Sequence, residues 1–142
     1  METLALPHTT TEANKQVVLD YVEAFNRADM PALRRIFADD ALVYGVLGWG
    51  TMDQVIPVWQ ELHAAFALQL QVEAVAAEGD NVMVRYLERG QSVGSFRGSP
   101  VTGKSYEIVA MEHFLVQDGR IQRRWGARDS AAMNRQMGLP LS

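Results

Sequence analysis

The hydrophobic periodicity of this chain changes once, near Leu68, from helical to strand-like, and that change limits the available folds. Before it, helical spacing predicts helices over residues 12–28, 30–37 and from 51 to near 66, with a short strand at 39–44 and a loop at 45–50. After it, runs at 68–77, 82–89, 105–117 and 120–129 alternate as strands do, and Asp118-Gly119 is a hairpin signal. Helices followed by an antiparallel meander indicate an α+β domain.

Local signals place the starts of the second and third helices. Asp29 precedes Pro31 as an N-cap does, and Thr51 is followed three residues later by Gln54, the spacing of a capping box. With 142 residues, 48% of them hydrophobic, the chain has the apolar mass for one core. We therefore expect a flexible leader over 1–12 and a single domain over 13–142.

Composition excludes several classes of function. The formal net charge of −4, without a strong basic cluster, argues against binding to nucleic acid or to an acidic membrane surface. The absence of cysteine rules out disulfides and a cysteine nucleophile, and the three histidines have no metal-binding spacing. We expect neither a metal nor a cofactor. Without a signal peptide or a membrane-length apolar run, a cytoplasmic location is expected.

Alternation along 105–117 assigns side chains to two faces of one strand. One face carries Glu112 between Ala110 and Phe114, and the other carries His113 among apolar residues. Both faces are mostly apolar, while the chain has too little helix to cover both. We expect the helices to cover the first face and a second copy of the chain to cover the outer one, which gives a homodimer.

Several motifs along the chain carry a family resemblance in their order and distances. They are Phe25-Asn26-Arg27-Ala28-Asp29, Phe37-Ala38-Asp39-Asp40, Ala77-Glu78-Gly79-Asp80-Asn81-Val82 with Arg85, Thr102-Gly103-Lys104, Asp118-Gly119-Arg120-Ile121, the Trp125–Asp129 pair and Gln136-Met137-Gly138. This pattern, from Asn14 to Pro140, resembles the SnoaL-like polyketide cyclases of the nuclear transport factor 2-like superfamily. The resemblance implies a cystatin-like cone, in which a curved antiparallel sheet wraps around three N-terminal helices.

The resemblance also implies a catalytic carboxylate. Members of the family keep an acid/base aspartate on the strand before the Asp-Gly hairpin, and the matching position here is Glu112. Burial on an apolar strand makes an unpaired charge costly there, which suits a general acid/base. The competing interpretation is a structural glutamate paired with an arginine such as Arg85 or Arg128. Ser92 stands where family members often carry a histidine.

Further candidates share these elements, and each has a structural alternative. Tyr44 and Tyr86 would donate from strands to a carbonyl or epoxide oxygen, or else be core aromatics. Asp129 would assist the chemistry or cap a strand end, and His63 would act from the third helix or pack against its aromatic neighbours. Trp49 is a candidate lid over the pocket mouth. The remaining candidates for substrate contact are aromatic: Trp59, Tyr106, Phe114 and Trp125.

Three functions stay open. The first is a cofactor-independent cyclase or isomerase that moves a proton on a hydrophobic polyketide-type molecule with Glu112. The second opens an epoxide in the same pocket. The third is a non-catalytic ligand-binding or dimerisation module. Polarity at the cavity floor distinguishes them, because a lone buried carboxylate with tyrosine hydroxyls aimed at empty space favours chemistry, whereas a packed floor favours the module.

Overall fold

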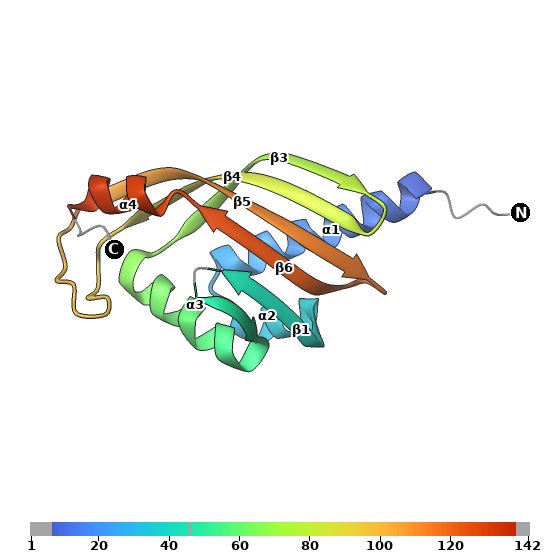
Figure 1. The fold of residues 1–142 in the computed structure, drawn as a ribbon, viewed down its shortest axis with the longest axis horizontal. Coiled ribbons are helices and arrows are strands. Elements are labelled where there is room, and N and C mark those ends of the chain that lie inside the picture. The colour runs from blue at the N-terminus through green and yellow to red at the C-terminus, as the bar shows by residue number, and fades with distance from the viewer. Residues whose placement is uncertain (1–6, 46, 139–142) are drawn as a thin grey trace, which may run out of the picture.

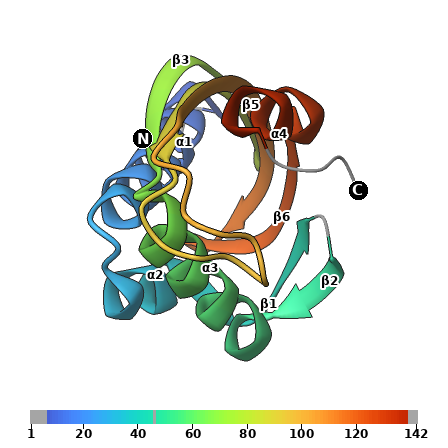
Figure 2. The same cartoon turned by 90° about the vertical axis from the view of Figure 1, so that its left-hand side faces the viewer.

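The computed structural model describes residues 7–45 and 47–138, which form an α+β cone. Its elements run α1 (Pro7–Asn26), α2 (Met30–Ile36), β1 (Phe37–Gly45), β2 (Gly48–Thr51), α3 (Met52–Phe66), β3 (Gln69–Glu78), β4 (Asn81–Gln91), β5 (Ser105–Gln117), β6 (Arg120–Arg128) and α4 (Ser130–Met137). The strands lie in the order β2-β1-β6-β5-β4-β3 (Figure 1). Seen from one end, the sheet curves around the helices, which confirms the predicted fold class (Figure 2).

The two predicted helix starts are confirmed. The side chain of Asp29 accepts a hydrogen bond from the amide of Ala32, and Pro31 occupies the first turn of α2. Thr51 and Gln54 form a complete capping box at the start of α3, with each side chain bonded to the other residue's amide. These caps fix where α2 begins after α1 and where α3 begins after β2.

The sheet is mixed rather than wholly antiparallel. Strands β3 to β6 form the predicted meander, and β2 pairs antiparallel with β1, but β1 pairs with β6 in parallel. No hairpin joins β1 to β6, so their relative direction is set by packing and not by a turn that the sequence displays. The 45–50 segment, expected to be a loop, contributes most of β2.

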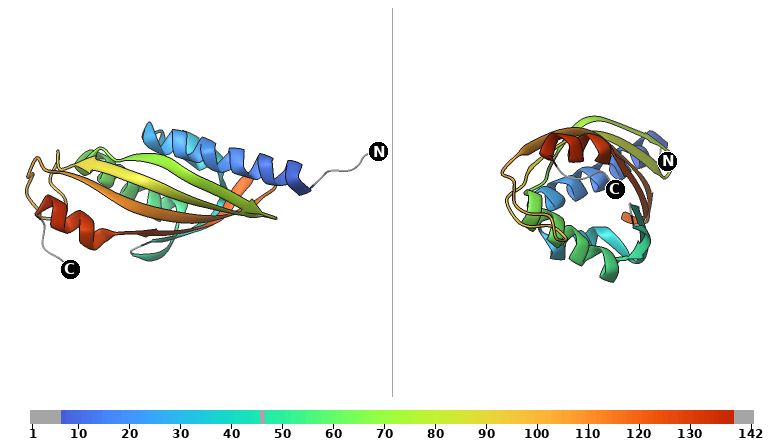
Figure 3. Two further views of the ribbon diagram at one scale, coloured as in Figure 1. Left: turned by 90° about the horizontal axis from the view of Figure 1, so that it is seen from above. Right: turned by 60° about the vertical axis from the view of Figure 1, so that its left-hand side comes forward.

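Both ends of the domain differ from expectation. The first helix begins at Pro7, so residues 7–12 of the expected flexible leader are helical, and residues 1–6 lie outside the described part. A fourth helix, α4, follows β6 and lies at the end of the sheet away from the start of α1 (Figure 3). Asp129 caps α4 by accepting from the amide of Ala132.

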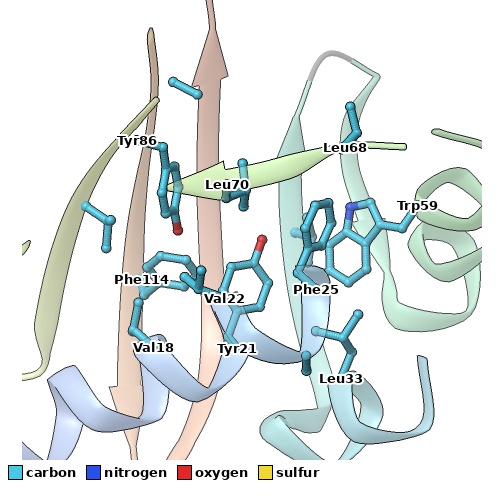
Figure 4. Packing of buried hydrophobic residues seen from close by; sticks show 14 of the residues in the cluster. Val18, Tyr21, Val22, Phe25, Leu33, Trp59, Leu68, Leu70, Tyr86 and Phe114 are labelled. Atoms are coloured by element: carbon cyan, nitrogen blue, oxygen red, sulfur yellow. The ribbon is translucent and has the colours of Figure 1, made fainter. Parts of the chain in front are cut away.

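The core lies between α1, α2, α3 and the inner face of the sheet. Its largest fully buried side chains include Tyr21, Phe37, Phe66, Tyr86 and Phe114. In Figure 4, Tyr21 of α1 extends between Phe114 of the sheet and Phe25 of its own helix, with Trp59 of α3 beyond them. Tyr21 meets Phe114 edge-on, with ring centroids 5.1 Å apart. No described helix has both the length and the apolar content to cross a bilayer.

Candidate active site

A cavity of about 340 Å3 opens between the inner face of the sheet and the helices. Most of its lining is apolar and comes from α1, α3, β1, the β1–β2 hairpin and the start of β3 with the segment before it: Phe25, Val43, Leu47, Trp49, Val55, Val58, Trp59, Leu62, Leu68 and Leu70. Its polar lining comes mostly from the sheet, and includes Tyr86, Glu88, Glu112, Arg124 and Arg128, with Tyr21 added by α1. Such a cavity suits a hydrophobic small molecule that is oriented by a few polar groups.

Glu112 is the centre of the first polar cluster. The Tyr86 hydroxyl donates to Oε1 at 2.7 Å, and the Tyr21 hydroxyl donates to Oε2 at 3.2 Å. Arg124 Nη1 lies 3.0 Å from Oε2, in an ion pair whose side chains are only 10% and 11% exposed. Three donors from three elements therefore face one carboxylate, an arrangement that stabilises its ionised form.

The neighbours of Glu112 hold their protons firmly. Burial, followed by the charge of Glu112, raises the pKa of Tyr86 far above its ordinary value. The same two causes raise the pKa of Tyr21. Both hydroxyls are therefore protonated donors at neutral pH. The guanidinium of Arg124 also lies over the Trp59 ring, with Cζ 5.7 Å from the ring centroid, which helps to fix its position.

Gly126 has no side chain, and the ion pair occupies the space where one would lie. It is the partner of Glu112 across β5 and β6, and a Cβ built at Gly126 would collide with Arg124 Nη1. The same Cβ would lie 3.7 Å from Glu112 Oε2. Any side chain at this position would require the Arg124 guanidinium to shift from its present place beside the carboxylate.

A second polar cluster lies farther along the same wall. Arg128 donates to both oxygens of Glu88, through Nε at 3.2 Å to Oε1 and through Nη2 to Oε2. The Tyr106 hydroxyl donates to Glu88 Oε2 at 2.6 Å. Burial lowers the pKa of Arg128, but the charge and hydrogen bonds of Glu88 outweigh it, so the net pKa is raised and the guanidinium stays charged.

Four of the predicted site residues line the cavity. Glu112 and Tyr86 form its polar floor, and Trp59 is part of the apolar wall. Trp49 lies in the β1–β2 hairpin and is 49% exposed, and its ring packs against those of Tyr44 and Trp125, with centroids 5.2 and 5.7 Å apart, rather than over the cavity as a lid would. The arginine that pairs with Glu112 is Arg124, and not Arg85 or Arg128 as anticipated, since Arg85 is exposed and Arg128 binds Glu88.

Asp129 and His63 are not among the residues that line the cavity. Asp129 is exposed and its carboxylate is engaged in the N-cap of α4. His63 packs on Phe25, with ring centroids 4.6 Å apart, and its Nε2 is buried without a hydrogen-bond partner in the described structure. Burial lowers the pKa of His63 below 6.5. These positions match the structural alternatives for both residues.

Tyr44 and Trp125 lie on the outer face of the sheet. Regular pairing continued from Gln117 and Arg120 would put Trp125 opposite Glu112, but a register shift between Leu115 and Val116 puts Gly126 there. Trp125 consequently stacks on His113 outside, at 4.6 Å between centroids. Tyr44 pairs with Trp125 across β1 and β6, and is 42% exposed.

Tyr106 and Phe114 face inward without lining the cavity. Phe114 is fully buried and packs under Tyr21, which places it in the core beneath the polar floor. Tyr106 is buried behind Glu88, to which it donates its hydroxyl proton. Both residues therefore support cavity-lining groups rather than contacting a ligand themselves.

Sequence reasoning missed Tyr21, Glu88, Arg124 and Arg128 as cavity residues. Alternation from Tyr86 places Glu88 on the same face of β4, so that signal was available. The arginines were hidden by the register shift in β6, and Tyr21 by its place in an apolar helix stripe. Among the described residues, no three histidine, aspartate or glutamate side chains gather as metal ligands would.

Comparison with known proteins adds a family and a shared fold. The model of the SnoaL-like polyketide cyclase family matches residues 15–137. The crystal structure of IdmH, a candidate polyketide cyclase from Streptomyces antibioticus, is 28% identical, covers 89% of this chain and 99% of its own, and superposes with a TM-score of 0.79. A comparison with curated protein sequences gave no match.

Two more distant structures share the fold alone. A candidate SnoaL-like polyketide cyclase from Jannaschia sp. CCS1 is 22% identical, with 99% of each chain covered and a TM-score of 0.84. An LEH-like epoxide hydrolase from M. tuberculosis is 14% identical, with 90% of this chain and 91% of its own covered and a TM-score of 0.73. Their identities are too low to carry chemistry across to this chain.

The first prediction concerns Gly126. Gly126→Ala should lower the free energy of unfolding by roughly 1–3 kcal/mol, because the new methyl group collides with Arg124. Urea denaturation measures the change. Gly45→Ala in β1 is the matched control, since no atom lies within 4 Å of its added Cβ, and it should cost little. Equal stability of Gly126→Ala and wild type would contradict the role assigned to this glycine.

The second prediction concerns pH. The unfolded chain protonates His63 near pH 6.5, whereas the folded chain resists protonation because its pKa is lowered. Folding stability therefore falls as the pH drops below about 6.5. His63→Phe keeps an aromatic ring on Phe25 and removes the titrating group, so it should lose less stability than wild type between pH 7 and pH 5. Parallel thermal-unfolding curves for the two proteins across this range would refute the prediction.

Proposed function

The chain belongs to the SnoaL-like polyketide cyclase family, and from that premise we propose that it cyclises or isomerises a hydrophobic polyketide-type molecule by general acid/base catalysis, without a cofactor. Glu112 is the proposed base. One observation carries the proposal: a carboxylate supplied with three donors lies at the floor of an otherwise mainly apolar cavity.

In the proposed first step, the Glu112 carboxylate takes a proton from the carbon next to a substrate carbonyl, while Arg124 and the two tyrosine hydroxyls hold the carboxylate in place. That step leaves an enolate and a neutral Glu112. Tyr21, Tyr86 and Arg124 then face a carboxyl group that has lost its charge, and their N–H and O–H donors become free to stabilise the new oxyanion.

The enolate has two ways forward. Attack of its carbon on a second carbonyl closes a ring, and the protonated Glu112 then returns its proton to the alkoxide. Reprotonation at another carbon of the enolate isomerises the substrate instead. The apolar lining excludes water from either intermediate.

The third prediction tests Glu112 with 2-tetralone, a two-ring ketone with acidic C–H bonds. Wild-type protein in D2O should accelerate deuterium exchange at its C1, followed by NMR. Glu112→Gln should slow the catalysed exchange by about 10²–10⁴-fold, the range for loss of a general base. Glu107→Gln, on the exposed face of the same strand, is the matched control and should leave the rate unchanged.

The outcomes separate the alternatives. A fully active Glu112→Gln variant would eliminate Glu112 as the base. Binding of 2-tetralone by wild type without any exchange would support a ligand-binding module. Hydrolysis of styrene oxide that depends on Glu112, without ketone exchange, would instead support an epoxide-opening enzyme.

We also propose that the outer sheet face joins two copies of the chain. Met83, His113, Trp125, Tyr44 and Trp49 are neighbours in register across five strands. Met83, Tyr44 and Trp49 are about half exposed, as are Val109 and Met111 on the same face of β5. An apolar surface of this extent is typical of an interface.

The fourth prediction is therefore a homodimer at micromolar concentration, seen by analytical ultracentrifugation. Met111→Glu places a charge in the proposed interface and should yield a folded monomer. Gln60→Glu, at an exposed position of α3 and not on the sheet, is the control and should stay dimeric. A monomeric wild type would remove this proposal.

A further inference from the structure

The Glu88–Arg128 pair is a polar site in the cavity that the proposed proton transfer does not use. Both residues line the cavity, and in the described part of the chain neither forms a hydrogen bond or ion pair with the donors that surround Glu112. Along β6, Arg128 follows Gly126, the partner of Glu112, by two residues, which is roughly 7 Å of strand. The guanidinium extends farther still, to Glu88 on β4. The cavity wall thus has polar groups at two separate positions.

Arg128 is held rigidly and still has donors to spare. Its Nε and Nη2 bind the two oxygens of Glu88, and Nη2 also lies 3.4 Å from the Tyr106 hydroxyl. Within the part of the chain that the structure describes, its Nη1 group forms no hydrogen bond. The Arg128 side chain is 22% exposed, whereas Glu88 behind it is 5% exposed. A fixed guanidinium therefore offers one amino group to a ligand.

Charge balance decides which ligand group suits this position. Glu88 neutralises Arg128, and Glu112 neutralises Arg124, so the four charges on the cavity wall cancel. A ligand carboxylate beside Arg128 would lie close to the Glu88 carboxylate and would be the one uncompensated charge in a mainly apolar cavity. A ketone or ester carbonyl accepts the same hydrogen bond without that cost.

We propose that Arg128, positioned by Glu88 and Tyr106, is a specificity-determining residue that binds a neutral carbonyl oxygen of the substrate, and that the cavity selects esters or ketones over free acids. This inference rests on the proposed function and names the substrate class of the same site. The reacting end of the substrate lies at Glu112, and the recognised carbonyl lies at Arg128.

The fifth prediction uses three matched probes and isothermal titration calorimetry at pH 7.5: methyl 2-naphthoate, 2-naphthoate and 2-ethylnaphthalene. Wild type should bind the ester at least about tenfold more tightly than the acid, because the ester brings no charge into the cavity. It should also bind the ester more tightly than the hydrocarbon, because the ester carbonyl accepts one additional hydrogen bond. Equal affinity for the ester and the acid would overturn the proposal.

Glu88→Gln supplies the sharper test. It removes the compensating charge and keeps a hydrogen-bonding side chain beside Tyr106 and Arg128. The acid should gain about tenfold or more in affinity, since Arg128 then carries a net charge, while the ester should change less than about threefold. An unchanged ratio of acid to ester affinity would overturn the proposal.

Glu107→Gln is the matched control, because it makes the same change of charge on the exposed outer face of the sheet. The acid should gain less than about threefold in this variant. An equal gain would show that only the net charge of the chain matters, and would refute recognition at Arg128. The probes undergo no exchange of the kind tested with 2-tetralone, so failure here is distinguishable from failure of Glu112 as a base.

Arg128→Lys provides a second test if Glu88→Gln does not fold. Lysine keeps the charge but lacks the planar fork that binds Glu88 and a ligand together. The ester should lose about tenfold in affinity and approach the hydrocarbon. Undiminished ester affinity in this variant would overturn the proposal.

Discussion

An ionised carboxylate can face an apolar cavity only when donors compensate its charge, and the cluster around Glu112 meets that condition with groups from three parts of the fold. Tyr21 comes from α1, Tyr86 from β4 and Arg124 from β6. The hydroxyl of Tyr21 reaches the carboxylate while its ring packs against Phe114, so one side chain joins the apolar core to the polar floor. The same contacts that dock α1 on the sheet thus complete the candidate active site.

The register shift between Leu115 and Val116 decides which side chains of β6 face the cavity. It turns Arg124, Gly126 and Arg128 inward and Trp125 outward. Without the shift, Trp125 would stand opposite Glu112, Arg124 and Arg128 would face the outside, and Arg123 would take the position opposite Phe114 that Arg124 now occupies. One extra residue therefore decides which arginines face into the cone and sets the aromatic row on its outer face.

This shift also marks where sequence reasoning stops. Periodicity, caps and the Asp118-Gly119 hairpin predicted the α+β order and the inward face of β5 with Glu112 on it, because those signals are local. Which side chains of β6 face inward depends on how β6 pairs with β5. No residue type near Gln122 indicates the bulge. The placement of Trp125 was therefore wrong, and Arg124 was missed. Asp129 illustrates a different failure, since a residue matched to a family motif is engaged here in the N-cap of α4.

The two Glu–Arg pairs differ in when their hydrogen-bond donors are available to a ligand. Around Glu112, all three donors point at one carboxylate, so they are released only when that carboxylate takes a proton, and they respond to the reaction itself. Around Glu88, the carboxylate is deeply buried and Arg128 keeps one amino group uncommitted, so that donor is available before any reaction. Interactions present from the start favour binding, whereas those gained during proton transfer favour catalysis. Because the pairs use different carboxylates and different arginines, a change in substrate preference at Arg128 need not disturb the proposed base.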